Sequence, residues 1–403
     1  MALMPVAEAL ALVLEGVEPL PSQAVPLEDA FGRVLADDLT ARRTQPPEAM
    51  SAMDGYAVRA ADVATAPTAL RVVGEVSAGH PFAGSIGPGE AARIFTGGVL
   101  PPGADAVVIQ ENTTRQDDRV TVQSPVTKSR NVRAAGLDFS RGQTLLHRAR
   151  RLSSRDVMLA AGMNYPTVPV YRRPKVGILA TGDELVMPGN EPGPGEIVYS
   201  NGFGLAALAR AEGAEVLNLG IVPDRIAETS AAVRRAREAG CDVLVTTGGA
   251  SVGDHDIVQQ ALTAEGLALS FWKIALRPGK PMMHGRLGAM RVLGLPGNPV
   301  SSFVCAVLFL TPLLRRLAGR SDVENEFEDA VLGRDLPAND ERADYLRATL
   351  ERGVDGSEVA TPVPAQDSSM MAPLARAQCL VIREPHAAEA AAGSRCRILK
   401  LRI

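Results

Sequence analysis

The sequence predicts a multi-domain α/β protein with a central, doubly wound parallel sheet. The chain has 403 residues, which is too long for one ordinary domain. Between residues 173 and 320, continuous apolar runs such as VGILATG and DVLVTTGG alternate with helix-like segments. This alternation is typical of parallel strands that are buried on both faces. Outside this region, short alternating segments and frequent turns indicate β-structure.

The flanking segments predict three further domains. Helical spacing in residues 5–15, in PLEDAFGRVLA (26–36) and in SSRDVMLAAGM (153–163) predicts helices on both sides of a β-rich stretch. In the tail, short apolar segments such as QCLVIRE and RCRILKLRI predict a small barrel. The expected domains are a helical N-terminal domain formed by residues 1–42 and 139–172, a β-rich domain over 43–138, the α/β domain over 173–320 and a C-terminal β-barrel over 321–403.

Composition excludes several classes of protein. The net charge of −4 argues against a dedicated surface for nucleic acid or an anionic membrane. The cysteines are far apart and form no CxxC pair, so neither a disulfide framework nor a zinc site is expected. The first residues, MALMPVAEALALVLEG, lack the basic region of a secretory signal. The apolar run from Phe303 to Leu314 is shorter than the roughly 20 residues that span a membrane and contains Pro312, so it predicts a buried helix of a cytoplasmic protein.

Predicted strands end in glycine-rich turns within ILATGDEL (178–185), LVTTGGASVGDHD (244–256) and LGLPGNPVSS (293–302). In an open parallel sheet, ligands bind beyond the carboxyl ends of the strands, near a switch point. Glycines let the backbone approach a ligand, and helix N-termini present free N–H groups to anions. A single such turn is most simply a strand-to-helix connection, but several at one edge predict a phosphate-binding floor. Its candidate residues are Thr181, Gly182, Asp183, Thr247, Gly248, Gly249, Ser251, Pro296, Gly297 and Asn298.

Acidic residues after two of these strands predict a divalent cation. Asp183 and Glu184 follow the first strand, and Asp254 and Asp256 follow the second. Each acid alone is about as well explained by a solvated loop, but carboxylates beside a phosphate floor suit Mg²⁺. The stiff RPGKP loop (277–281) adds an arginine and a lysine as anion clamps. Since neither a Walker A motif nor GxGxxG is present, we expect phosphoryl or oxyanion chemistry with a metal rather than a standard ATP or NAD site.

Residues 51–57, SAMDGYA, place a single acid in a small turn beside a glycine. Taken alone, Asp54 is most simply a residue that caps its own turn. However, SAMDGYAVRAAD, FTGGVLPPGADAVV, GDELV, TTGGASVGDHD, RPGKPMM and GLPGNPVSS follow one another along the chain. With these motifs the chain resembles, over essentially its whole length, the molybdopterin molybdenumtransferase (MoeA) family, whose relatives include the E domains of animal gephyrin and its plant counterpart.

The resemblance implies a final step of molybdenum cofactor synthesis, in which molybdate is inserted into adenylylated molybdopterin with Mg²⁺ and AMP is released. The catalytic residues that it implies are Asp54, Thr96, Asp138, Glu184, Asp224 and Asp256, of which Glu184 and Asp256 match the family's contacts with Mg²⁺ and phosphate. The molybdate-binding residues that it implies are Arg277, Lys280, Pro281, Ser301, Arg347 and Ser368. It also implies an elongated homodimer, in which Asp54 of one subunit reaches the α/β domain of the other.

The chain departs from the family pattern at a few positions. Lysine is frequent in the family where Arg277 stands, an aromatic residue is common at His284, and Ala372-Pro373 replaces a frequent Ser-Ser pair. Two other functions stay open. A molybdopterin adenylyltransferase, which could also be a partner, usually has TGGTG where this chain has TGGAS, and it lacks the SAMDGYA domain. A non-catalytic scaffold could lose its acids, whereas the acids implied to be catalytic are all present here.

Overall fold

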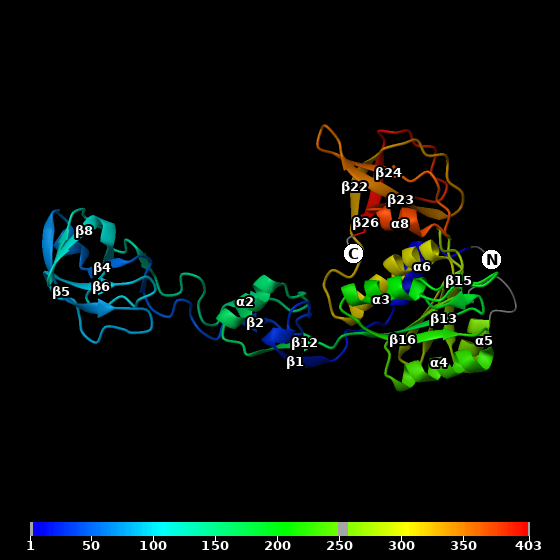
Figure 1. Ribbon diagram of the computed structural model, residues 1–403, viewed down its shortest axis with the longest axis horizontal. Coiled ribbons are helices and arrows are strands. Elements are labelled where there is room, and N and C mark those ends of the chain that lie inside the picture. The colour runs from blue at the N-terminus through cyan, green and yellow to red at the C-terminus, as the bar shows by residue number, and fades with distance from the viewer. Residues whose placement is uncertain (1–2, 249–256, 402–403) are drawn as a thin grey trace.

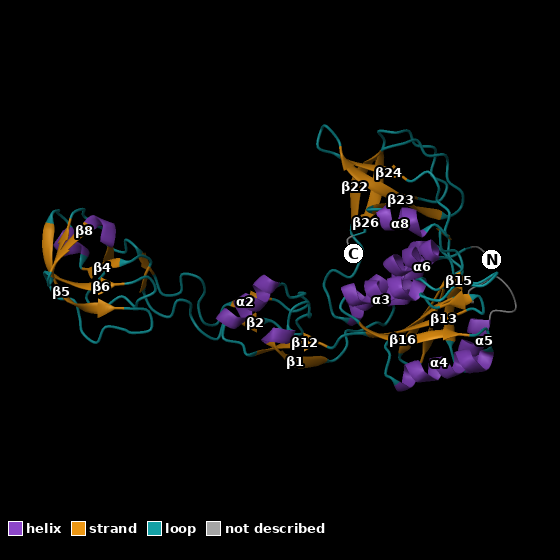
Figure 2. Cartoon of the chain, in the orientation of Figure 1, coloured by secondary structure: helices purple, strands orange, loops and turns teal. Residues whose placement is uncertain are grey.

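The computed structural model describes residues 3–248 and 257–401 and has an elongated shape (Figure 1). A β-rich unit lies at one end and a small mixed unit in the middle (Figure 2). The other end holds an α/β unit with a β-barrel beside it. The predicted fold class, a doubly wound α/β sheet combined with β-rich parts, is confirmed.

The α/β unit is built on a six-stranded sheet in the order β16-β13-β17-β21-β20-β18. Strand β13 pairs in parallel with β16 on one side and β17 on the other, and β17 pairs in parallel with β21. The winding direction therefore reverses beside β13, which places the carboxyl ends of β13 and β17 at a topological switch point. The strands are β13 (Lys175–Thr181), β16 (Glu215–Val222), β17 (Val243–Thr247), β18 (Ala268–Trp272), β20 (Met283–Leu287) and β21 (Met290–Leu295).

Helices cover both faces of this sheet. Val176 and Ile178 of β13 belong to a core shared with α1, α3 and a long apolar helix, whereas Leu179 packs with α4 and α5 on the opposite face. Alternate residues of one strand are thus buried on opposite sides, which explains the continuous apolar runs in the sequence. The helices are α1 (Val6–Leu14), α3 (Asn201–Ala211), α4 (Ile226–Glu238) and α5 (Ile257–Ala264).

The long apolar helix consists of α6 (Pro299–Cys305), a π-helical segment (Ala306–Leu310) and α7 (Thr311–Leu317). Its 19 residues have a mean hydropathy of 1.6 in their most apolar stretch, which by length and composition alone would be enough to cross a membrane. However, 83% of that stretch is buried inside the protein. The prediction of a buried helix is therefore confirmed, although the helix is longer than the apolar run that predicted it.

The β-rich unit contains a six-stranded sheet in the order β7-β4-β6-β5-β9-β8, with a short ribbon of β3 and β10. Gly55, which follows Asp54, begins β4 at a point where a Cβ atom would overlap the carbonyl oxygen of Val108 on β7. Glycine is therefore required for the close pairing of these strands. The strands are β3 (Met50–Ser51), β4 (Gly55–Val58), β5 (Thr68–Val76), β6 (Glu90–Ile94), β7 (Ala106–Ile109), β8 (Thr113–Gln116), β9 (Arg119–Val122) and β10 (Val132–Arg133).

The middle unit contains two antiparallel ribbons and α2 (Ser154–Gly162) around a small core of its own. Strand β1 (Ser22–Pro26) pairs with β12 (Thr167–Tyr171), and β2 (Leu39–Thr40) pairs with β11 (Thr144–Leu146). The helix expected over residues 153–163 is confirmed by α2.

The helix expected over residues 26–36 does not form. Only Leu27–Asp29 make a short 3₁₀ turn, and the chain then bends at Gly32, whose φ is +72°. Helix α1 forms as expected, but it packs in the core of the α/β unit rather than with α2. The apolar residues of this segment are instead buried without a helix. Leu35, for example, is buried and forms an isolated bridge with Val170.

The C-terminal part is a closed five-stranded barrel, as expected. The strands follow one another in the order β23-β24-β22-β26-β25, and the pairing of β23 with β25 closes the ring. A short strand of the α/β unit, β19 (Leu276–Arg277), pairs in parallel with β23 and joins the two units. The remaining elements are β22 (Phe327–Leu332), β23 (Ala343–Arg352), β24 (Glu358–Pro362), β25 (Cys379–Arg383), β26 (Arg395–Lys400), α8 (Met371–Arg376) and the ribbon of β14 (Leu185–Val186) and β15 (Ile197–Val198).

Candidate active site

The glycine-rich turns lie side by side at the switch point of the α/β sheet. A Cβ atom on Gly248 would overlap the carbonyl oxygen of Thr181, and one on Gly297 would lie 3.8 Å from the Cα atom of Gly248. Asn201, at the start of α3, donates a hydrogen bond of 2.6 Å from Nδ2 to the carbonyl oxygen of Gly297. Turns separated by up to about a hundred residues of sequence are therefore brought into contact, as the sheet topology predicts.

Buried hydroxyl groups lie at the same edge. Thr181 and Thr246 are 2% and 0% exposed, and their Oγ1 atoms lack a hydrogen-bond partner within the described residues. Since buried polar groups are normally satisfied, unpaired hydroxyls beside this turn cluster suit a polar ligand. The predicted residues Gly249, Ser251 and Asp256 lie outside the described part of the chain.

Asp183, Glu184 and Asp224 form an acidic edge next to these turns. The backbone N–H of Asp224 donates to Oδ1 of Asp183 at 3.2 Å, and the carboxylate of Glu184 folds back against Gly182. Burial, followed by the negative charges of Asp183 and Glu184, raises the pKa of Asp224 above its usual value. Among residues 3–248 and 257–401, no group of three or more acids, histidines or cysteines is arranged as a finished metal site. The acids nevertheless supply the oxygen donors that Mg²⁺ prefers, to be completed by a phosphate ligand.

In the β-rich unit, the structure brings Asp54 and Thr96 together. Oδ1 of Asp54 accepts hydrogen bonds from the backbone N–H of Thr96 at 2.7 Å and from its hydroxyl group at 2.8 Å. The backbone donor, then the hydroxyl group and the charge of Arg93 lower the pKa of Asp54, so this carboxylate is ionised over a wide range of pH. Asp138 is exposed on the connection between β10 and β11, where its backbone N–H donates to the carbonyl oxygen of Gln45.

Within one chain, the SAMDGYA turn does not meet the acidic edge. Strand β4, which follows Asp54, lies at the far end of the molecule from β13, with the middle unit between them (Figure 1). A site that contains both Asp54 and Asp224 therefore requires a second copy of the chain.

The RPGKP loop and the loop that carries Ser368 both contact α6. Cys305 in α6 directs its Sγ atom toward the carbonyl oxygen of Gly279 at 3.7 Å. Asn298 donates from Nδ2 to Oγ of Ser368 at 2.9 Å, and the N–H of Val300 donates to the carbonyl oxygen of Ser368 at 3.0 Å. Ser301 is 5% exposed. The structure thus places the loop of Ser368 at the start of α6, where Ser301 lies, and the RPGKP loop against Cys305 at the end of the same short helix.

Both arginines that were expected to bind molybdate are occupied by the protein itself. The Arg277 guanidinium pairs with Asp340 and Asp344 of the barrel region. Arg347, which is 1% exposed, donates to the side chain of Gln366 and to the carbonyl oxygens of Ala365, Asp367 and Met370. Sequence reasoning missed Asn201, Asp344 and Gln366, because their partners are distant in sequence and no motif marks them.

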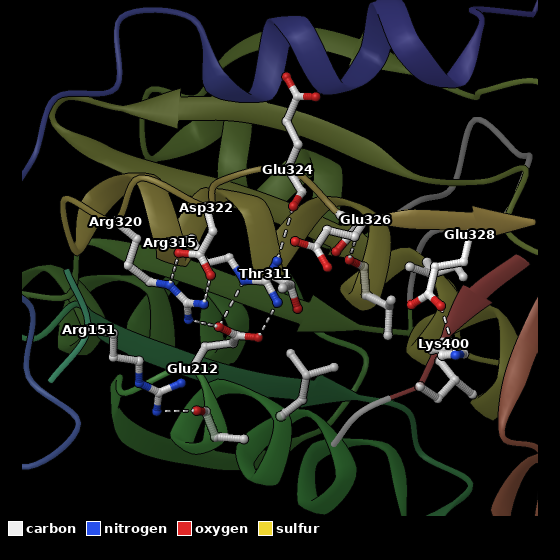
Figure 3. A pocket seen from close by; sticks show the side chains of 16 residues that line it. Arg151, Glu212, Thr311, Arg315, Arg320, Asp322, Glu324, Glu326, Glu328 and Lys400 are labelled. Atoms are coloured by element: carbon white, nitrogen blue, oxygen red, sulfur yellow. Dashed lines mark hydrogen bonds and ion pairs between the residues drawn. The ribbon is translucent and has the colours of Figure 1, made fainter. Parts of the chain in front are cut away.

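A separate polar cavity of about 350 Å³ lies where the α/β unit meets the barrel and the middle unit (Figure 3). Glu212, at the end of α3, accepts hydrogen bonds from Arg315 and Arg320, while Arg151 of the middle unit donates to the carbonyl oxygen of Ala211. These groups satisfy one another, so the cavity is a junction between units and lies apart from the acidic edge.

Comparisons with known proteins agree over nearly the whole chain. Family models match residues 4–163 ("MoeA N-terminal region (domain I and II)"), 177–316 ("Probable molybdopterin binding domain") and 329–401 ("MoeA C-terminal region (domain IV)"). Relatives named molybdopterin molybdenumtransferase are 34% identical in Haemophilus influenzae, over 93% of both chains, and 39% identical in a Nostoc species, over 74% of this chain and 70% of the relative.

Solved structures agree as well. A crystal structure of a molybdopterin biosynthesis moeA protein from Pyrococcus horikoshii superposes with a TM-score of 0.86 at 30% identity, and each chain is covered to 100%. Another structure, of a molybdopterin biosynthesis moeA protein from Pyrococcus horikoshii OT3, superposes with a TM-score of 0.83 at 28% identity, covering 99% of this chain and 100% of the other.

Proposed function

This chain belongs to the molybdopterin molybdenumtransferase family and is an enzyme of molybdenum cofactor biosynthesis, and we propose that it inserts molybdate into adenylylated molybdopterin with release of AMP. The observation that carries the proposal is the meeting of glycine turns and acids at the switch point of the α/β sheet. Glycine turns with buried hydroxyl groups suit the phosphoanhydride of such a substrate. The acidic edge suits Mg²⁺ bound by one or two carboxylates and by the substrate's phosphates.

In this proposal Glu184, together with Asp256 beyond the described residues, would hold Mg²⁺, which when bound neutralises charge on the phosphate oxygens. Burial is the main cause of the raised pKa of Asp224, and the negative charges of Asp183 and Glu184 add to it; a cation at this edge would relieve their repulsion. Asp224 is suited to accept a proton from the water that adds to phosphorus, because it lies at the acidic edge beside Asp183. The P–O bond of the anhydride then breaks, and AMP leaves.

We assign the molybdate to a position beside α6, between the two loops that contact this short helix, where Lys280, Pro281, Ser301 and Ser368 would surround it. Lys280 is exposed, and its Nζ atom takes part in no ion pair with the described residues. Serine hydroxyl groups and backbone N–H groups add neutral donors for an oxyanion.

We further propose a homodimer, in which the β-rich unit of one subunit covers the acidic edge of the other and supplies Asp54, Thr96 and Asp138. The distance between these ends of the elongated chain supports this arrangement. The four segments expected from the sequence would each act as a domain of a cytoplasmic enzyme. An adenylyltransferase would supply the adenylylated substrate.

The test is AMP release from adenylylated molybdopterin, followed by chromatography with and without molybdate and Mg²⁺. We expect release that requires both ions and that falls at least about a hundredfold in Asp224→Asn and in Asp54→Asn. Asp322→Asn is the matched control, because that acid pairs with Arg320 at the separate junction. Binding of the substrate without AMP release under any condition would favour a scaffold, and net formation of the adenylylated substrate from ATP would favour an adenylyltransferase.

A further inference from the structure

Arg277 ties the RPGKP loop to the barrel region with nearly all its donors. Nε donates a hydrogen bond of 2.6 Å to Oδ1 of Asp344, and Nη2 donates to Oδ2 of the same carboxylate. Nη1 donates to Asp340 at 2.8 Å, and Nη2 donates to Oδ1 of Asn339 at 2.8 Å. These hydrogen bonds use all but one of the N–H groups of the guanidinium. The two-pronged contact with Asp344 is the strong, geometrically specific kind.

The charges of this cluster cancel one another. Asp340 also pairs with Arg342 at 3.0 Å, so that two arginines face two aspartates. Asp344 is 6% exposed, and a carboxylate at that depth needs its cation. An oxyanion that bound the two-pronged face of Arg277 would have to separate it from Asp344 and would leave that carboxylate buried without its partner. The cluster thus offers little net positive charge to a molybdate ion.

The strand that holds Arg277 also organises the second loop. Asp344 and Arg347 both lie on β23, and Arg347 holds the backbone carbonyl groups on either side of Ser368. Ser368 in turn contacts Asn298 at the start of α6. One strand of the barrel therefore contacts residues that hold both loops next to α6.

We infer that Arg277 is a positioning residue, which fixes the RPGKP loop through Asp344 without touching the oxyanion, so that Lys280 is the cation of this loop that meets molybdate. This inference rests on the proposed function, because it takes molybdate as the ligand. Lys280 is exposed at the tip of the loop, and its carbonyl oxygen accepts hydrogen bonds from the N–H groups of Ile274 and Met282, both at 3.0 Å. Those two bonds hold the tip of the loop, and Arg277 holds its base against the barrel region.

The test uses full-length protein, molybdate itself as the probe, and calorimetry to measure its dissociation constant. If Arg277 acts through Asp344, Arg277→Met and Asp344→Asn should each weaken binding by roughly tenfold or more, and the double variant should be no weaker than either single variant. Arg277→Lys should lie between wild type and Arg277→Met, because it keeps the charge but loses the fork. Arg342→Met is the matched control, since it removes a cation from the same cluster without contacting the loop; it should bind normally.

A second readout does not depend on molybdate. Hydrogen exchange at the amides of Ile274 and Met282 should become faster in Arg277→Met and Asp344→Asn and should stay unchanged in Lys280→Gln, although Lys280→Gln loses molybdate binding. If Asp344→Asn binds molybdate as tightly as wild type or more tightly, Arg277 is a direct ligand and the inference is wrong. If the wild type binds no molybdate, both the role of Lys280 and the proposed function fail. If binding is normal but AMP is never released, only the proposed function fails.

Discussion

At the scale of single residues, the hydroxyl group of Thr96 has a defined effect on Asp54. The two hydrogen bonds from Thr96 lower the pKa of Asp54, so Thr96→Val, which removes the hydroxyl donor, should raise that pKa toward its usual value. The acid limb of AMP release should move to higher pH in the same variant. Titration of the Asp54 carboxyl carbon by NMR checks the prediction. Asp38, whose pKa is lowered by the N–H of Arg148, is the internal reference and should not change.

Asp224 should lower the stability of the free enzyme. Its raised pKa means that the folded chain holds this proton more tightly than the unfolded chain does. The destabilisation is therefore absent below the pKa that Asp224 has in the unfolded chain. It grows as pH rises and is complete above the pKa that Asp224 has in the folded chain. Without Mg²⁺, Asp224→Asn should increase the free energy of unfolding at pH 7, with a smaller gain at acidic pH.

Urea unfolding of the α/β unit at several pH values measures this effect. Glu18→Gln, an exposed acid in the loop between α1 and β1, is the control and should change little. An Asp224→Asn protein that is less stable than wild type at pH 7 would show that the carboxylate contributes structural hydrogen bonds that outweigh its repulsion.

The contacts of some of these residues could be predicted from the sequence, and those of others could not. Gly248 directly follows the buried strand β17, and Gly297 follows β21 after one proline, so the topology of a parallel sheet was enough to predict that they meet. The partner of Arg277 is 67 residues away on a barrel strand, and no spacing rule connects the two. The charge of a residue is visible in the sequence, but whether the protein itself neutralises it depends on packing between units.

At the scale of elements, α2 depends on its first residue. Oγ of Ser153 accepts from the N–H of Asp156, and the Asp156 carboxylate accepts from the N–H of Ser153, which together form a capping box. Ser153→Ala should therefore destabilise α2 by about 1 kcal/mol. Hydrogen exchange of the α2 amides checks this. Ser200→Ala is the matched control, because Ser200 precedes α3 without a side-chain cap, and equal effects in both helices would contradict the prediction.

Elements were predictable where the local pattern and the packing agree. In α2, the capping residue and the apolar spacing both favour a helix, and a helix forms. In residues 26–36 the apolar spacing is similar, but Pro26 opens the segment and Gly32 adopts a positive φ, so bridges to neighbouring strands replace the helix. Apolar periodicity shows which residues are buried, whereas glycine and proline decide whether a helix can bury them.

At the scale of the whole molecule, the elongated shape means that two chains must form the proposed active site together. Asp54 and Asp224 lie in units at opposite ends of one subunit, so a shared site must take one acid from each copy (Figure 1). Asp54→Ala and Asp224→Ala chains should each be inactive alone. In a dimer of the two, one site combines both substitutions, while the other combines both wild-type acids.

Co-expression of these two variants should therefore restore about a quarter of the wild-type AMP release, because random pairing makes about half of the dimers mixed and each mixed dimer has one intact site. The control pairs Asp224→Ala with Glu184→Ala. Both acids lie on the acidic edge of a single chain, so every site in that mixture keeps one substitution and activity should stay lost. Recovery in the control but not in the first mixture would mean that the acidic edge, rather than the SAMDGYA turn, is divided between subunits, and the proposed dimer would be wrong.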